Sequence, residues 1–126
     1  MAGLTLDSGA LIAFERVDRR VILHLKEAEL RGLELTIPTA VIVEVWRGGA
    51  RSARIASLLS VAVVEPLSED IARRAGEALA TVNGTSVVDA VVMSSAAQRN
   101  DRVLTADLDD LKRRRHHFPG VRLVRL

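Results

Sequence analysis

The stretch Gly-Leu-Thr-Leu-Asp-Ser-Gly-Ala-Leu-Ile-Ala-Phe, at residues 3–14, does most to predict the fold. A short apolar run at residues 3–6 halts at Asp7-Ser8-Gly9, and an aliphatic run begins directly afterwards. This pattern indicates a strand that turns tightly into a helix. Open α/β sheets bind ligands at the carboxyl ends of their strands, so Asp7 is the first candidate site residue.

Strand-like and helix-like segments alternate along the rest of the chain. We expect helix 39–47 to be capped by Thr39, and strand 61–64 to be buried. Residues 87–92 are β-branched and could form a strand, but their apolar spacing and a Ser86–Asp89 capping box favour a helix. The other expected strands are 33–37, 102–105 and 121–126, and the other expected helices are 19–31, 51–59, 68–80 and 107–115.

This alternation predicts βαβ units, and therefore an α/β fold in which helices cover both faces of a parallel sheet. With 126 residues, 48% of them hydrophobic, the chain is expected to form one domain over residues 1–126. No apolar run approaches the ~20 residues that cross a bilayer. There is no basic leader and there are no cysteines, so a cytoplasmic protein without membrane contact is expected.

Four carboxylates, of Asp7, Glu44, Asp89 and Asp107, lie where expected strands or loops meet helices, or on a helix flank. Carboxylate oxygens are the ligands that Mg²⁺ and Mn²⁺ prefer, and such a site suits phosphate-ester chemistry. The net charge is only +2, but without these four acids 18 basic residues would face 12 acidic ones. An anionic pocket with cationic surroundings suits an enzyme that holds a polyanion, although each arginine taken singly could be a solvated surface residue.

Each acid also has a structural interpretation. Asp7, Asp89 and Asp107 could simply cap helices or form turns. Glu44 is different, because it lies five residues past Thr39 and beside an apolar stripe that includes Val41 and Val45. Burial beside that stripe would require a ligand or a partner, and an ion pair with a nearby arginine or a solvated carboxylate is the alternative.

The order of these motifs resembles the PIN-domain ribonucleases, and within them the small VapC-type toxins of toxin-antitoxin pairs. The resemblance covers essentially the whole chain and rests on four short motifs on the β–α alternation. They are Asp7-Ser8-Gly9 after the first strand, Glu44 in the helix after Pro38-Thr39, Val88-Asp89-Ala90 and Thr105-Ala106-Asp107.

The resemblance implies a three-layer α/β/α fold whose central sheet is mainly parallel and has four to five strands. It also implies that Asp7, Glu44, Asp89 and Asp107 are the catalytic, metal-binding acids. Ser8 and Thr105 would be supporting hydroxyl residues, and Asp109 or Asp110 could share the role of Asp107. The implied activity is hydrolysis of RNA phosphodiesters by water that Mg²⁺, or Mn²⁺ in its place, activates.

The partners implied by the resemblance are RNA and a cognate antitoxin that covers the acidic site. We also expect a homodimer, because the expected helices 19–31 and 39–47 leave apolar faces that a 126-residue monomer would not fully cover. A base-stacking surface is disfavoured, because aromatic residues make up only 2% of the chain. No serine has the His and Asp partners of a nucleophile, and His24, His116 and His117 are interpreted as solvated or helix-end residues. Residues 112–117 are basic, and they form either a solvated helix end or a rim that tracks phosphates.

Two other functions remain open from the residues alone. A phosphoacceptor or phosphatase domain would also place acids at strand ends, but this chain lacks a second acid two residues after Asp7. A non-catalytic module of the same fold could bind RNA or protein without cutting anything. Retention of all four acids favours the nuclease over that module.

Overall fold

The computed structural model describes residues 2–106, 118 and 120–126. Within them the order of helices and strands is the alternation that the sequence predicts. The elements are β1 (Leu4–Leu6), α1 (Ser8–Glu15), α2 (Arg19–Leu30), β2 (Leu35–Pro38), α3 (Thr39–Val45), the 3-10 turn η1 (Gly49–Ser52), α4 (Ala53–Leu59), β3 (Val63–Glu65), α5 (Glu69–Thr81), α6 (Val87–Arg99), β4 (Arg102–Thr105) and β5 (Arg122–Arg125).

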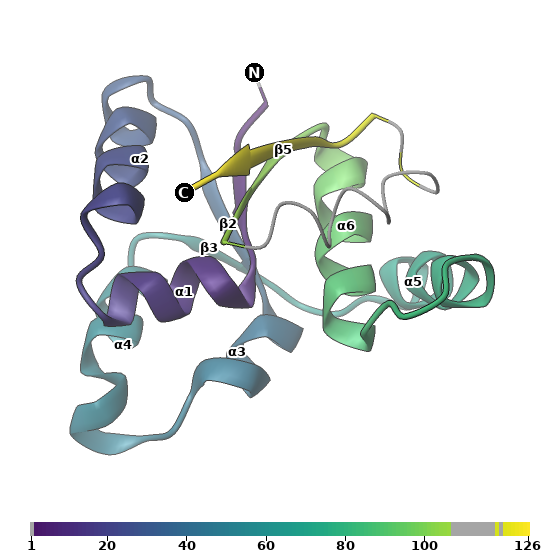
Figure 1. Cartoon of the computed structure of the whole chain (residues 1–126), viewed down its shortest axis with the longest axis horizontal. Coiled ribbons are helices and arrows are strands. Elements are labelled where there is room, and N and C mark those ends of the chain that lie inside the picture. Colours follow the sequence, from purple (N-terminus) through teal and green to yellow (C-terminus); the bar gives the residue numbers. More distant parts are fainter. Residues whose placement is uncertain (1, 107–117, 119) are drawn as a thin grey trace.

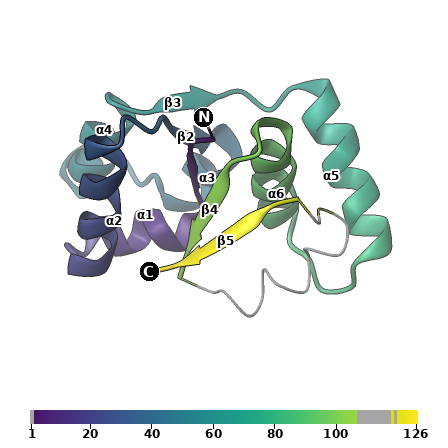
Figure 2. The same cartoon turned by 90° about the horizontal axis from the view of Figure 1, so that it is seen from above.

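The strands of the described residues form one five-stranded, wholly parallel sheet in the order β3-β2-β1-β4-β5. Figure 2 shows α1, α2 and α4 on one side of this sheet and α5 and α6 on the other. The three-layer α/β/α architecture expected from the sequence is therefore confirmed. α6 packs on the central strands, and α5 packs on α6 (Figure 1).

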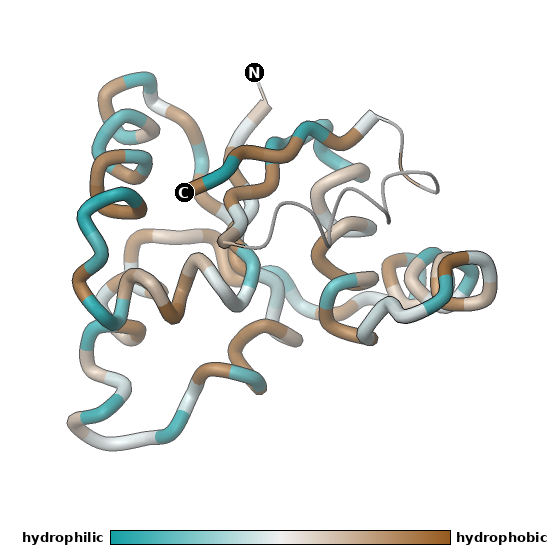
Figure 3. Tube along the Cα trace, in the orientation of Figure 1, coloured by the Kyte–Doolittle hydropathy of each residue, from teal (hydrophilic) through white to brown (hydrophobic). Residues whose placement is uncertain are grey.

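The core is aliphatic and lies on both faces of the central strands. Leu6, Leu11, Ile37, Met93 and Leu104 are fully buried. Figure 3 shows hydrophilic and hydrophobic residues alternating along α2, whereas α6 is buried over most of its length. The sequence segment that was ambiguous between strand and helix, residues 87–92, is thus the start of a buried helix.

Three local predictions are wrong. The strand expected to be buried at residues 61–64 is instead β3 (Val63–Glu65) at an edge of the sheet, and Val63 and Val64 are 43% and 37% exposed. Thr39 does not cap α3, because Pro38 occupies the N-cap position without a side-chain hydrogen bond and Thr39 is already helical. That helix also ends at Val45, two residues early, because the chain is extended at Trp46.

Candidate active site at the carboxyl edge of the sheet

Asp7 lies directly after β1 and is 5% exposed. It is the N-cap of α1, and its Oδ1 accepts a hydrogen bond of 2.8 Å from the backbone N–H of Ala10. The capping role expected as an alternative for Asp7 is therefore real. It does not exclude a second role, because a carboxylate offers about four lone-pair positions on two oxygens and the cap occupies Oδ1.

Glu44 lies on the exposed side of α3 and is oriented by the residue that follows Asp7. The Ser8 hydroxyl donates a hydrogen bond to Glu44 Oε1. Arg47 donates instead to the backbone carbonyl of Glu44, at 2.8 Å, so the ion pair considered from the sequence is not formed. Because Glu44 is exposed, its carboxylate does not carry the desolvation cost expected from the sequence. The hydrogen bond from Ser8, rather than burial, links Glu44 to the site.

Asp89 lies in the first turn of α6 and is half-buried. Its backbone N–H donates to the Ser86 hydroxyl, at 3.1 Å, which is the capping bond that the sequence predicts. The next residue, Ala90, is buried in a small apolar cluster that Ala40 of α3 packs against. The start of α6 is thereby held against the start of α3.

These contacts place Asp7 and Asp89 at the carboxyl end of the sheet, and the hydrogen bond from Ser8 holds Glu44 beside the start of α1. α1 packs on α3, α3 packs on α6, and all three helices begin beyond the carboxyl ends of strands (Figure 1). Their N-terminal N–H groups face this end, and a partial positive charge at a helix N-terminus stabilises nearby carboxylates. Gly9 allows the start of α1 to lie close to the segment after β4, because a Cβ added at Gly9 would lie 3.1 Å from the Cβ of Ala106.

Thr105, the expected supporting hydroxyl residue, is fully buried at the end of β4. Asp107, its alternatives Asp109 and Asp110, the helix expected at 107–115 and the basic run 112–117 all lie outside the described residues. Within the described ranges, no three His, Cys, Asp or Glu side chains are close enough together to hold a metal ion. The donors there are hard oxygen ligands, which suit Mg²⁺ or Mn²⁺, but the described part of the site is incomplete by itself.

A buried polar network on α6 was missed by the sequence analysis. The Arg99 guanidinium donates to Asp101 Oδ2 at 3.1 Å, Thr5 Oγ1 at 2.8 Å, Ser95 Oγ at 2.9 Å and Glu65 Oε2. Asp101, 3% exposed, also accepts from the Gly3 N–H and the Thr5 hydroxyl, both at 2.8 Å. This network ties α6 to β1, β3 and the start of β4. A threonine inside an otherwise apolar strand was the signal that could have revealed it.

The model of the PIN domain family matches residues 4–116 of this sequence. The chain belongs to the PIN domain family. The match includes β1 to β4 and all four candidate acids. A comparison with curated proteins gives no significant sequence match for this PIN domain. None of the helices in the described part of the chain is long and apolar enough to span a membrane.

Solved structures share this PIN fold at low sequence identity. One is a chain of VapBC2 from Rickettsia felis, solved with a fragment of promoter DNA, at 16% identity and a TM-score of 0.77, with 98% of both chains covered. DNA-bound VapBC from Salmonella typhimurium has 16% identity and a TM-score of 0.76, and the alignment covers 99% of this chain and 98% of the other. VapBC-5 from Mycobacterium tuberculosis, a toxin-antitoxin system, has 20% identity and a TM-score of 0.62, and the alignment covers both chains completely.

Proposed function

We propose that this PIN domain is a metal-dependent endoribonuclease and the toxin of a toxin-antitoxin pair, acting in the cytoplasm. The observation that supports the proposal is that Asp7 and Asp89 lie at the starts of α1 and α6, at the carboxyl edge of the sheet, while the Ser8 hydroxyl, next to Asp7, bonds to Glu44. PIN domains are generally nucleases, and similar solved structures are VapBC complexes. RNA as the substrate, rather than another phosphodiester, follows from the resemblance to VapC-type toxins.

The chain's own residues have distinct tasks in this proposal. Asp7, Glu44 and Asp89, with Asp107, would hold Mg²⁺ or Mn²⁺. When bound, such an ion supplies a Lewis acid for the phosphoryl group and lowers the pKa of an attacking water. The N–H of Ala10 fixes Asp7 and the Ser8 hydroxyl orients Glu44, so that both carboxylates are positioned before substrate binds.

Cleavage of a labelled RNA by the purified chain tests the nuclease proposal. Asp7→Asn, Glu44→Gln and Asp89→Asn each keep the shape of the side chain but remove a charge, and each should lower the rate by at least about a hundredfold. Asp70→Asn on α5 is the matched control, because that carboxylate is 62% exposed and, among the described residues, forms an ion pair with Arg74 alone. Full cleavage in excess EDTA, or RNA binding by the wild type without cleavage in Mg²⁺, would refute the proposal.

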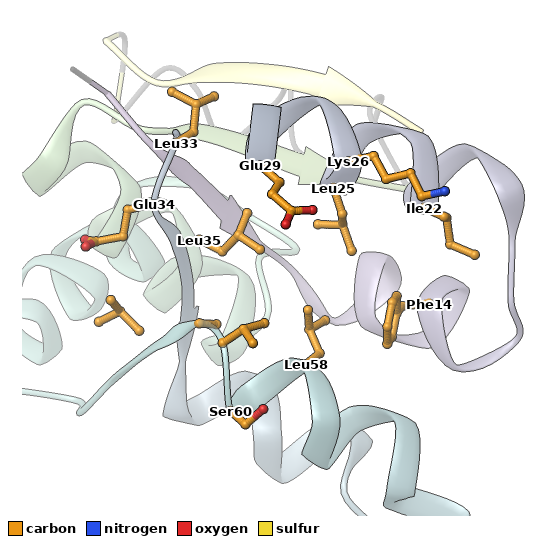
Figure 4. Close-up of a pocket in the computed structure, with 13 residues that line it drawn as sticks. Phe14, Ile22, Leu25, Lys26, Glu29, Leu33, Glu34, Leu35, Leu58 and Ser60 are labelled. Carbon is orange, nitrogen blue, oxygen red and sulfur yellow. The ribbon is translucent and has the colours of Figure 1, made fainter. Parts of the chain in front are cut away.

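An apolar groove supports a protein partner. It has a volume of about 710 Å³ and lies between α1, α2, α4 and the segments around β2 and β3. Figure 4 shows Leu25, Leu35 and Leu58 pointing into it, with Phe14 at one end. Charged residues are few and include Lys26 and Glu29 of α2. An amphipathic antitoxin segment fits such a groove, because its apolar side chains can occupy it while its polar face stays in water.

Growth of cells that express the chain tests the toxin assignment. The wild type alone should arrest growth, and the product of the adjacent small gene should relieve the arrest. Leu25→Gln should weaken that relief and leave RNA cleavage unchanged, whereas Leu67→Gln, at a residue that is 47% exposed and outside the groove, should change neither. Harmless high-level expression of the wild type, with no antitoxin present, would refute the toxin assignment even if the chain cleaves RNA.

A homodimer is the remaining part of the proposal. α2 and α3 were expected to leave apolar surface uncovered, and Leu23, Leu30 and Val43 are 66%, 88% and 79% exposed. Exposed aliphatic side chains on the surface of a small domain favour self-association. Sedimentation equilibrium should give twice the mass of the 126-residue chain, and Val43→Asp should shift the mass toward that of one chain. A wild type that sediments as a single chain at high concentration would contradict a homodimer.

A further inference from the structure

Three arginines surround a cleft at the amino edge of the sheet, the end opposite Asp7. Arg102 begins β4, Arg122 begins β5, and Arg31 is the C-cap residue of α2. The cleft, which we call the arginine cleft, has a volume of about 400 Å³. Its other lining residues are Ala2, Leu33, Asn100 and Gly120.

The charges of the arginine cleft are poorly compensated. Arg102 and Arg122 are direct neighbours in the parallel register of β4 and β5, and like charges placed opposite each other destabilise a sheet. Neither forms an ion pair within the part of the chain that the structure describes, and no lining residue is acidic. Arg31 pairs with Glu27 at 3.0 Å, but both side chains are more than half exposed, so water screens that pair.

A smaller adjoining cavity continues the positive surface. It has a volume of about 120 Å³, shares Arg31 and Arg102 with the arginine cleft, and adds His24 and Glu27. The two cavities together therefore hold three guanidinium groups against one described carboxylate. Arg102 and Arg122 repel each other at the starts of adjacent strands, and Arg31 lies beside them. An anion between these guanidinium groups would offset their repulsion.

The chemistry of this lining favours phosphate. The planar guanidinium fork matches the oxygens of a phosphate, and neighbouring strands are about 4.8 Å apart, so two forks can contact one phosphate or two successive ones. None of the described residues that line the cleft has an aromatic side chain on which a base could stack. Contacts here would therefore be made to a nucleic acid backbone and would be independent of sequence.

We propose that the arginine cleft binds the phosphate backbone of the RNA at a second site, separate from the acidic edge. The proposal deepens the proposed function, since RNA as the natural polyanion rests on it. The edge strand β5 connects the two ends: Arg122 lies at the cleft, and exposed Arg125, whose side chain points to the other face of the sheet, is the register partner of Thr105, three residues and ~10 Å farther along. An RNA strand that follows β5 reaches the acidic edge, so the cleft extends the footprint beyond the cleaved bond.

Fluorescence anisotropy with a labelled, unstructured oligoribonucleotide in EDTA tests the cleft without cleavage. Each phosphate contact on a single strand contributes about 0.7 to the slope of log K against log salt, so Arg102→Gln with Arg122→Gln should lower that slope by about 1.4. Extrapolated from 1 M to 0.1 M salt, this is a loss of about 25-fold in affinity. The control, Arg73→Gln with Arg74→Gln on α5, removes the same net charge from arginines that pair with Glu69 and Asp70.

The outcomes separate the cleft from the nuclease proposal. RNA binding at the arginine cleft would be refuted by an unchanged salt slope in the Arg102/Arg122 variant, or by an equal fall of the slope in the Arg73/Arg74 control. Either result would count whether or not the wild type cleaves RNA. Polyglutamate of equal charge tests an acidic peptide as the ligand: if it loses binding in the variant while RNA does not, the RNA assignment is wrong. The variant should melt no lower than the wild type, because the cross-strand repulsion between Arg102 and Arg122 is removed. A lower melting temperature would contradict the claim that these two charges repel each other without compensation.

Discussion

Substitution of Arg99 by methionine removes the centre of the buried network that fixes α6. Methionine has similar length and is compatible with a helix, so the change removes charge and donors more than volume. Four hydrogen bonds disappear, and Asp101, which is 3% exposed, keeps its bonds from Gly3 and Thr5 among the described residues. Breaking a buried ion pair by removing one partner leaves the other charge uncompensated.

The expected cost follows from how buried the partners are. Fully buried pairs cost 3–5 kcal/mol to break, and the Arg99 and Glu65 side chains are 22% and 20% exposed, so the free energy of unfolding should fall by about 3 kcal/mol. For a domain of this size that corresponds to a drop in melting temperature of about 10 °C. Urea unfolding followed by circular dichroism should show a lower midpoint with an unchanged slope.

Arg73→Met on α5 is the matched control for this prediction. Arg73 also pairs with a carboxylate, that of Glu69 at 2.8 Å, but the two side chains are 76% and 79% exposed. Exposed i,i+4 pairs contribute about 0.3–0.5 kcal/mol, so this variant should unfold almost as the wild type does. If Arg99→Met costs less than about 1 kcal/mol, or no more than Arg73→Met, the network does not hold α6 as the structure indicates.

Three further substitutions test local parts of the account. Gly3→Ala would place a Cβ 2.4 Å from the Glu34 carbonyl oxygen, so overpacking should lower the free energy of unfolding by about 1–3 kcal/mol in a urea titration, and a neutral result would contradict this close approach. Ser52→Ala removes the acceptor of the Arg47 and Gly48 N–H groups, at 2.8 and 3.0 Å, and should cost about 1–2 kcal/mol in the same experiment; no loss would mean that water replaces it readily. The side-chain hydrogen bond from Arg20 lowers the pKa of Asp18 to about 2, so the contribution of this cap to stability should be present above its usual pKa and be lost only as the pH falls toward 2. A carboxyl NMR titration should show this depression and its loss in Arg20→Gln, and an ordinary pKa in the wild type would refute it.

The sequence predicts this fold well because its signals are local and repeated. Ser86 caps α6 and accepts the backbone N–H of Asp89, as the capping box predicts, and α5 begins at Glu69, one residue after the expected start. The failures have tertiary causes. β3 reads as a buried strand from its aliphatic residues, but its position at the edge of the sheet is set by the strand order, which no local pattern reveals. Propensity therefore predicted the element and not its exposure.

The candidate site shows the same division between local and long-range information. Asp7 was found because it follows a strand directly, and its cap is a local contact. The Ser8 to Glu44 bond joins residues 36 positions apart, and the Arg99 to Thr5 bond joins residues 94 positions apart. Neither pairing is visible in spacing. Burial also misled the interpretation of Glu44, because a position near an apolar stripe on the helical wheel proved to be on the solvent side.

Binding of Mn²⁺ to the purified chain, followed by isothermal titration calorimetry, tests the central claim most directly. The wild type should bind the ion, and Asp7→Asn, Glu44→Gln and Asp89→Asn should each weaken the affinity by about tenfold or more, since each removes one charged oxygen ligand. Asp70→Asn should bind as the wild type does. A wild type that binds no Mn²⁺ at millimolar concentrations, or three site variants that bind it unchanged, would contradict a metal centre at the carboxyl edge of the sheet.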